Sequence, residues 1–409
     1  MPFMPQCLTR WAIHMLNSRL FISEVVGLVG LSLIALGGPF VVHGAPTPSQ
    51  VPLLLDAPTQ VPPSIAQALP PQHLMQRWVK RHRRTGLNPV GLDVLTQPRT
   101  TGAQDLTVEL FDGKTHTFDL EPPRHHRTPT TVWRGRLRGE AGSEVSLALR
   151  DRTLVGTILS NDRLYKVESE SGNLLRLVEI DPEALPNDHH PIVVEDDLSS
   201  AAPATGDTST ASDPTAAATA GTVVDLLVVY TTAARTQEGG QAAIEALITL
   251  GVDQANQAYT NSQIDMQLQL IHTAEVAYTD SGTIDTDLTR LRSTTDGIMD
   301  EVHQLRERYQ ADLVALVVDN GGGSCGIAYV MANGPRASFA SSAFSVTARD
   351  CITNNTLAHE MGHNMGNAHD RANGSSSVYP YSYGYRDEVG KFRTIMAYAC
   401  PTVSCPRVK

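Results

Sequence analysis

One stretch of the sequence, Thr353–Asp370, limits what this chain can be more than any other. It reads TNNTLAHEMGHNMGNAHD and contains three histidines and a glutamate within eleven positions, namely His359, Glu360, His363 and His369. Residues four apart lie on one face of an α-helix, so His359 and His363 can direct both imidazoles at one metal ion. Glu360 lies next to the first histidine, where it can reach a water on the ion without binding the ion itself.

His369 cannot join them on the same helix, because six residues after His363 is the wrong helical angle. Gly366 removes the difficulty, since glycine adopts the left-handed conformation that ends a helix and lets the chain turn back. The alternative is a core helix that contains histidines by chance, but the pattern HExxHxxGxxHD fixes six positions. Three protein ligands leave one position of a tetrahedral zinc ion open, as in catalytic sites. We therefore predict one catalytic Zn²⁺ bound by His359, His363 and His369.

A methionine follows this motif, in the sequence TIMAY at Thr394–Tyr398. HExxHxxGxxH with a later methionine turn is the signature of the metzincin zinc endopeptidases, which the chain resembles from about Thr222 to its end. Asp370, directly after the third histidine, resembles the reprolysin-like branch. Together with VVDLLVVYTTAAR and GIAYVM, these features make the chain most similar to the bacterial peptidyl-Asp metallopeptidases.

The resemblance implies a reaction and assigns residues to it. Zinc lowers the pKa of a bound water to about 7, and Glu360 is the expected general base that takes its proton. Tyr398 matches a tyrosine that hydrogen-bonds the oxyanion, with a merely packed tyrosine as the alternative. We predict a zinc endopeptidase that acts on proteins or peptides. Cleavage before Asp would need a cation, for which Arg393 and Lys391 are candidates unless they are surface charges.

The sequence divides into four parts. Residues 1–45 have the layout of a signal peptide, although an uncleaved anchor is the competing interpretation. Residues 46–195 are expected to form a propeptide that is β-rich from about residue 105, followed by a small, polar linker at 196–221. Residues 222–409 form the protease domain. We expect a secreted monomer that is inhibited by its own propeptide and has no stable membrane association after signal cleavage.

Three details of the N-terminal half can be tested. The stretch 72–84 is predicted to form a short basic helix, and the strands after residue 105 a meander of six or seven. The pairs His125–His126 and His189–His190 are expected to be solvated, unless one of them blocks the zinc. No cysteine lies between Cys7 and Cys325, which excludes a propeptide thiolate as the blocking ligand.

The C-terminal half is predicted to be an α/β (α+β) domain of metzincin type, with a twisted mixed sheet and an active-site helix. In this family the strand at GIAYVM is the sheet edge that pairs with the substrate. Four cysteines allow three pairings, of which we favour Cys325–Cys351 and Cys400–Cys405 because each pair brackets one loop near the motif.

Two global features complete the expectations. The formal net charge of −11 argues against a nucleic-acid partner. The chain ends at Lys409, only 13 residues after Met396, whereas metzincins continue through a final helix. A truncated or catalytically impaired protein that keeps the fold as a binding module is therefore the alternative function.

Overall fold

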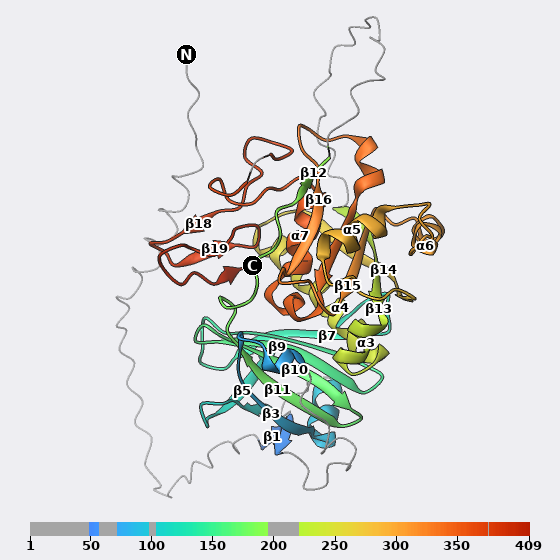
Figure 1. Cartoon of the computed structure of the whole chain (residues 1–409). Helices are drawn as coiled ribbons and strands as arrows, with labels where there is room; N and C mark the ends of the chain where they lie inside the picture. Colours follow the sequence, from blue (N-terminus) through green and yellow to red (C-terminus); the bar gives the residue numbers. More distant parts are fainter. Residues whose placement is uncertain (1–48, 57–71, 98–103, 195–220, 375) are drawn as a thin grey trace, which may run out of the picture. The chain divides into compact units, whose positions relative to one another are not determined.

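The computed structural model describes residues 49–56, 72–97, 104–194 and 221–409 except 375 (Figure 1). The predicted signal peptide lies outside the described residues, as does the predicted linker except for Gly221. The described residues belong to one compact unit that extends from Pro48 to Lys409. No helix in these ranges is long and apolar enough to cross a membrane.

The N-terminal region, residues 49–194, is built on a sheet of eleven described strands that is antiparallel except for the β1–β4 pair (Figure 1). Its main path is β1-β4-β5-β7-β8-β9-β10-β11-β3-β2, so the predicted meander is confirmed from β4 to β11. The strands are β1 (Gln50–Pro52), β2 (Leu54–Asp56), β3 (Val79–Leu87), β4 (Asp105–Glu109), β5 (Thr115–Leu120), β6 (Arg124–His125), β7 (Thr131–Leu137), β8 (Glu144–Arg150), β9 (Thr153–Ser160), β10 (Arg163–Ser171) and β11 (Leu174–Ile180). A short helix, α2 (Pro89–Thr96), follows β3.

The predicted basic helix at 72–84 is wrong. Only Gln72–Met75 form a helical turn, of the 3₁₀ type, and the basic residues that follow lie in β3. Arg81 stands opposite Glu179 of β11, and its Nε donates to that carboxylate at 2.7 Å. The pairing of cations on β3 with acids across the sheet outweighs the helix propensity of the local sequence, which is a weak preference.

The C-terminal region has a mixed sheet flanked by helices, so the predicted α/β class is confirmed. The sheet order is β12-β16-β17-β15-β13-β14, parallel except for the β16–β17 pair. The strands are β12 (Ile192–Val193), β13 (Thr222–Thr231), β14 (Met266–Val276), β15 (Leu313–Val318), β16 (Gly326–Val330) and β17 (Phe344–Ala348). The helices are α3 (Thr232–Glu238), α4 (Gln241–Asn261), α5 (Ile284–Arg292), α6 (Glu301–Tyr309) and α7 (Thr356–Asn364).

The edge of this sheet is covered by the N-terminal region itself. Strand β16 carries the GIAYVM sequence, and β12 pairs with it in parallel, Ile192 opposite Tyr329 and Val193 opposite Val330. Without β12, β16 would be the outermost strand. The strand predicted to pair with substrate, β16, is therefore already paired with Ile192 and Val193, which precede the predicted linker.

The two regions also share a hydrophobic core. Helix α4 packs on β8 and β9, and Val132, Ala148 and Val155 of the N-terminal sheet belong to the same buried cluster as Ile248 of α4. Such continuous burial of apolar side chains is the main stabilising contribution between packed elements. The N-terminal sheet is thus packed on the C-terminal region over a well-formed interface.

A small third sheet completes the fold. It consists of β18 (Arg386–Asp387), β19 (Phe392–Thr394) and β20 (Arg407–Val408), with β19 in the middle. Both favoured disulfides, Cys325–Cys351 and Cys400–Cys405, are present. The second one closes the loop that connects the methionine turn to β20.

Candidate metal centre

The three predicted ligands come together on and just after α7. His359 and His363 lie on this helix, which is buried along its whole length. The helix ends at Asn364 and is capped by Met365, and Gly366 then adopts a φ of +90°, the left-handed turn that the sequence predicts. This turn returns the chain so that His369 faces the other two imidazoles.

The ring nitrogens of these histidines form a compact triangle. The Nε2 atoms of His359, His363 and His369 are separated by 3.0, 3.0 and 3.1 Å. A tetrahedral ion with Zn–N distances of about 2.0–2.1 Å requires its ligand nitrogens to be about 3.3 Å apart. The Nδ1 atoms of His359 and His363 are satisfied by the carbonyls of Ile395 at 2.8 Å and Asn367 at 2.7 Å. Those bonds place the protons on Nδ1 and leave each Nε2 lone pair directed at the centre of the triangle.

The electrostatics also suit a cation. Burial lowers the pKa of His359 to about 4, although the charge of Asp188 acts in the opposite direction. Burial and His359 lower the pKa of His369 to about 2. His363 likewise has a pKa well below its usual value, chiefly because of burial. The three imidazoles are therefore neutral, which is the form that binds a metal ion. These residues fit the predicted zinc.

Glu360 lies beside the triangle with its carboxylate unsatisfied. The side chain is fully buried, and neither oxygen has a hydrogen-bond partner among the described residues. Burial, and next the charge of Asp188, raise its pKa well above the usual value. Gly326 of β16 packs against it so closely that a Cβ there would lie 2.3 Å from Oε1. A buried carboxylate without a partner is costly, so one that persists in this position indicates a function.

Met396 supports the helix from below, as the methionine turn predicts. A Cβ on Gly362 of α7 would lie 2.4 Å from its Sδ atom. Asp370 fixes the same turn, because its carboxylate accepts from the backbone N–H of Tyr398 at 3.2 Å and pairs with Arg386 at 2.9 Å. The methionine turn is therefore tied to the chain that follows the third histidine.

Tyr398 lies at the wall of the site. Its ring centroid is 4.0 Å from that of His369, and its hydroxyl donates to the backbone carbonyl of Asp188 at 2.9 Å. Burial raises the pKa of this phenol, and the charge of Asp188 adds to the effect, so the hydroxyl keeps its proton. Tyr398 therefore presents a hydrogen-bond donor to a carbonyl that lies in the cleft.

The sequence did not predict the segment that holds this carbonyl, Asn187–Val194. Its backbone hydrogen-bonds to β16, from His189 N to Gly326 O at 2.7 Å and from Cys325 N to Asn187 O at 3.0 Å. The ring of His190 lies 5.8 Å from that of His369, whereas His189 is half exposed beside Asp285. The pair His125–His126 lies elsewhere, with His126 3.4 Å from Asp253 of α4.

The two predicted specificity cations lie at different depths. Lys391 is exposed. Arg393 is buried, and its guanidinium donates to the carbonyls of Ala397 at 2.7 Å and Cys405 at 3.1 Å. The cation that contacts a carboxylate is instead Arg407, which pairs with Asp188 and which the sequence analysis did not single out. Nothing in the spacing around Arg407 distinguishes it from a surface arginine.

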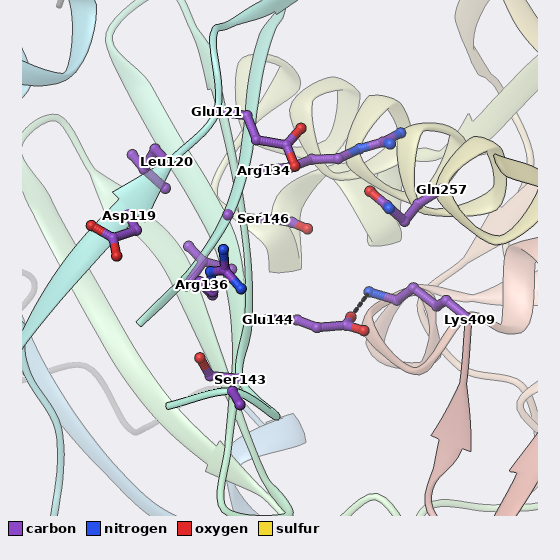
Figure 2. A pocket seen from close by; sticks show the side chains of 13 residues that line it. Asp119, Leu120, Glu121, Arg134, Arg136, Ser143, Glu144, Ser146, Gln257 and Lys409 are labelled. Carbon is purple, nitrogen blue, oxygen red and sulfur yellow. Dashed lines mark hydrogen bonds and ion pairs between the residues drawn. The ribbon is translucent and has the colours of Figure 1, made fainter. Parts of the chain in front are cut away.

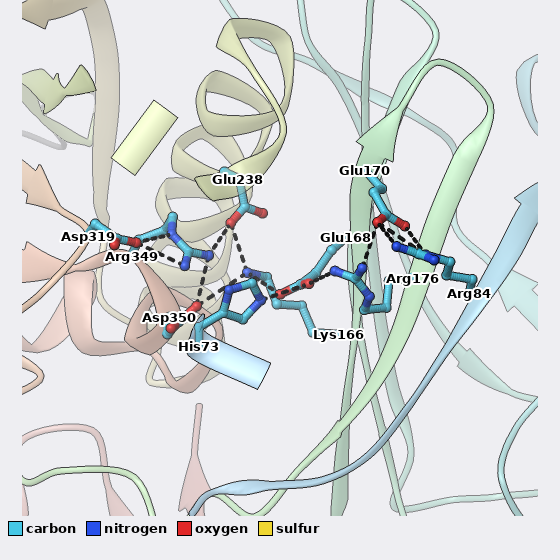
Figure 3. A network of polar contacts seen from close by, with 10 residues as sticks. All are labelled: His73, Arg84, Lys166, Glu168, Glu170, Arg176, Glu238, Asp319, Arg349 and Asp350. Carbon is cyan, nitrogen blue, oxygen red and sulfur yellow. Dashed lines mark hydrogen bonds and ion pairs between the residues drawn. The ribbon is translucent and has the colours of Figure 1, made fainter. Parts of the chain in front are cut away.

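A second group of titratable residues joins the two regions at a distance from the histidines (Figure 3). Lys166 of β10 is buried and pairs with Glu168 at 3.1 Å and with Glu238 of α3 at 2.9 Å. Arg349 binds the same Glu238 at 2.8 Å. His73, Glu168 and Asp350 are close enough to hold a metal, but the Lys166 ammonium already lies among them. We interpret this network as structural.

Two further features mark the contact between the regions. A pocket of about 580 Å³ lies between the N-terminal sheet and α4. Beside it, Lys409 binds Glu144 at 2.6 Å (Figure 2). Arg134 of β7 binds Asp253 of α4 at 2.5 Å. Burial alone would raise the pKa of Asp253, but hydrogen bonds with His126 and Arg134 lower it below the usual value.

Comparison with known proteins identifies the family of the chain. The profile of the metallo-peptidase family M12B, reprolysin-like, matches residues 220–408. A peptidyl-Asp metalloendopeptidase of Xanthomonas campestris pv. campestris is 31% identical over 345 residues, covering 77% of this chain and 79% of that protein. The chain belongs to this metallopeptidase family, and its relatives within it include the peptidyl-Asp metalloendopeptidases.

Other matches are more partial. A peptidyl-Asp metalloendopeptidase of Stenotrophomonas maltophilia is 35% identical over 283 residues, which are 66% of this chain. The match spans only 62% of that relative's length. Among solved structures, metalloproteinase-II from Bacteroides fragilis matches with a TM-score of 0.39 and 14% identity, over 65% of this chain and 81% of that one. A score this low supports no argument about the site.

Proposed function

We propose that the protein is a zinc-dependent endopeptidase whose N-terminal region is an inhibitory propeptide. The observation that carries this proposal is the triangle of Nε2 atoms beside the unpartnered carboxylate of Glu360. Membership of a metallopeptidase family supports it. The binding-protein alternative is not favoured, because all three histidines and the glutamate are present and converge.

His359, His363 and His369 would hold the ion, and a zinc ion bound there supplies Lewis acidity for a carbonyl and for a water. Glu360 accepts a proton from the attacking water and passes it to the nitrogen that leaves. Tyr398 donates a hydrogen bond to the oxygen that gains negative charge, as it now donates to the carbonyl of Asp188. Hydrolysis thus consumes one water and yields a new carboxyl and a new amino terminus.

Latency is supported by the position of Asn187–Val194. This segment hydrogen-bonds to β16 and to Tyr398, and its His190 ring lies 5.8 Å from that of His369. A substrate that adds to the same edge needs the same backbone groups. The propeptide therefore competes with substrate, and activation needs a cut between residues 194 and 222, where the sequence predicts a linker.

Two further properties belong to the proposal. The name of the relatives supports cleavage before Asp. Two disulfides and the signal-like N-terminus support export to an oxidising compartment.

The test is a digest of a peptide library by the full-length protein after limited proteolysis between residues 194 and 222. We expect cleavage that a chelator abolishes and zinc restores, with Asp as the first residue of the C-terminal fragment from each cut. Glu360→Gln is the matched control, since it preserves shape while removing the base. Undiminished cleavage by this variant, or cleavage that is insensitive to chelation, would overturn the proposal.

A further inference from the structure

A buried carboxylate pocket lies next to the metal ligands. The Asp188 side chain is 1% exposed, and its Oδ2 accepts from Arg407. Its Oδ1 accepts from Thr356 Oγ1 at 3.1 Å, one turn before His359 on α7. The same Oδ2 is 3.7 Å from Nδ1 of His359. The Asp188 carboxylate therefore lies directly beside His359, one of the three proposed metal ligands.

The backbone of Asp188 lies where a reacting peptide would lie. Its carbonyl accepts from Tyr398, and the next amide, of His189, donates to Gly326 O at 2.7 Å. Gly326 is the residue that packs against Glu360. The peptide bond held there is the one that follows Asp188, in a segment that runs parallel to β16. A substrate that pairs with β16 in the antiparallel direction would reverse this order and place the side chain after its cut bond beside Arg407.

Arg407 is built to bind a carboxylate at this position. Its side chain is 4% exposed, and Nη1 donates to the carbonyl of Asn354 at 2.9 Å, which fixes the guanidinium. Its Nε is buried and has no hydrogen-bond partner among the described residues, so one donor is still available. Arginine remains charged at any ordinary pH, so an empty pocket would leave a buried cation without a counterion.

The surrounding chain increases this demand for an anion. In the β19–β20 pair, Arg393 stands directly opposite Arg407, which places two buried guanidinium groups side by side. Arg393 is engaged by backbone carbonyls, so Arg407 is the one that presents donors to the pocket. The Cys400–Cys405 disulfide lies two residues before Arg407 and limits its movement.

We propose that Arg407 is the specificity-determining cation that receives the Asp side chain of the substrate, and that Asp188 occupies its pocket in the uncleaved chain. This inference rests on the proposed function and deepens it, because it identifies the residue responsible for the preference. Under this proposal, Arg407 binds two carboxylates in turn, first that of Asp188 and later that of a substrate aspartate. The Asp188 carboxylate keeps substrate out until the propeptide leaves, and a substrate aspartate then replaces it.

The experiment compares cleavage of three peptides that differ only in having Asp, Asn or Ala after the cut bond. Full-length protein, processed between residues 194 and 222, is assayed as wild type, Arg407→Gln, Arg407→Lys and Lys391→Gln. The last variant removes an exposed cation from the neighbouring turn and is the control. We expect Arg407→Gln to lower the Asp-to-Ala ratio of kcat/KM roughly 100-fold or more, with Ala cleavage retained. Arg407→Lys keeps part of the preference, and Lys391→Gln keeps all of it.

Thr356→Val keeps the proposal testable if the Arg407 variants fail to fold. It removes only the hydroxyl that donates to the Asp188 carboxylate. It should lower the Asp-to-Ala ratio roughly tenfold. An Asp preference that survives both Arg407→Gln and Thr356→Val overturns the assignment of Arg407 while the proposed peptidase stands. If the wild type cleaves with zinc but does not prefer Asp, the proposed role of Arg407 is wrong while the proposed peptidase stands. A wild type with no metal-dependent cleavage overturns the proposed function and this inference with it.

Discussion

Replacing Asp188 with asparagine tests how firmly the segment Asn187–Val194 is held in the cleft. The substitution preserves the shape of the side chain and removes its charge, so Arg407 loses its partner while remaining buried. The two side chains are 1% and 4% exposed, so solvent does not screen the pair appreciably. Removing one partner of a buried ion pair costs roughly 3–5 kcal/mol.

Hydrogen exchange measures this cost directly. The amides of His189 and Cys325 bond across the contact, to Gly326 O and Asn187 O, and exchange only when the segment opens. Since 1.4 kcal/mol corresponds to a factor of ten, the loss predicts exchange that is faster at both amides by roughly 100-fold to 4,000-fold. Amides in the centre of α4 should be unaffected, which confines the change to the segment.

Asp285→Asn is the matched control, because it removes an aspartate 3.5 Å from His189 in a pair that is 40% and 52% exposed. Exposed pairs contribute little, so exchange at the two amides should change by less than about threefold. Equal exchange in Asp188→Asn and in this control would refute the anchoring of the segment by Asp188.

Three other predictions follow from the same contacts. Tyr398→Phe should lower kcat about 100-fold with little change in KM, because it removes a donor to the developing charge; an unchanged kcat would return this tyrosine to a packing role. Gly362→Ala forces a Cβ against Met396 and should lower the free energy of unfolding by about 1–3 kcal/mol, seen as a lower Tm than in wild type; an unchanged Tm would contradict the close packing. The lowered pKa of Asp253 means that its carboxylate favours attachment of the N-terminal region above the pKa of a free aspartate, about 3.9, and that this contribution is lost as the pH falls further. Gel filtration of the processed protein should therefore show weaker attachment at pH 3 than at pH 7, with a smaller difference in Asp253→Asn; equal pH dependence in the two proteins would contradict it.

The convergence of the three histidines could be predicted from the sequence because its geometry is local. His359 and His363 share a helix face, and Gly366 supplies the turn, so three ligands follow from spacing alone. The disulfides could be favoured for a similar reason, since each pair brackets one loop. Local spacing of this kind carries over from sequence to structure because few other arrangements satisfy it.

The remaining features depend on distant contacts. Most basic residues of the stretch 72–84 lie in β3, which begins at Val79, because acids on β10 and β11 pair with them. No local pattern indicates those partners. Asp188 and Arg407 are separated by 219 positions in the chain and meet only in the folded protein. The sequence analysis selects Arg393 and Lys391 because they precede the methionine turn, whereas the proposed role of Arg407 rests on a buried guanidinium that contacts a carboxylate far away in the chain.

The most direct test of the metal centre is the zinc content of the purified full-length protein, measured beside Glu360→Gln and His363→Ala. We predict about one zinc per chain in the wild type and in Glu360→Gln, because the glutamate does not bind the ion. His363→Ala should lose nearly all of it. A wild type without zinc, or a His363→Ala variant that retains a full equivalent, would contradict the assignment of the three histidines.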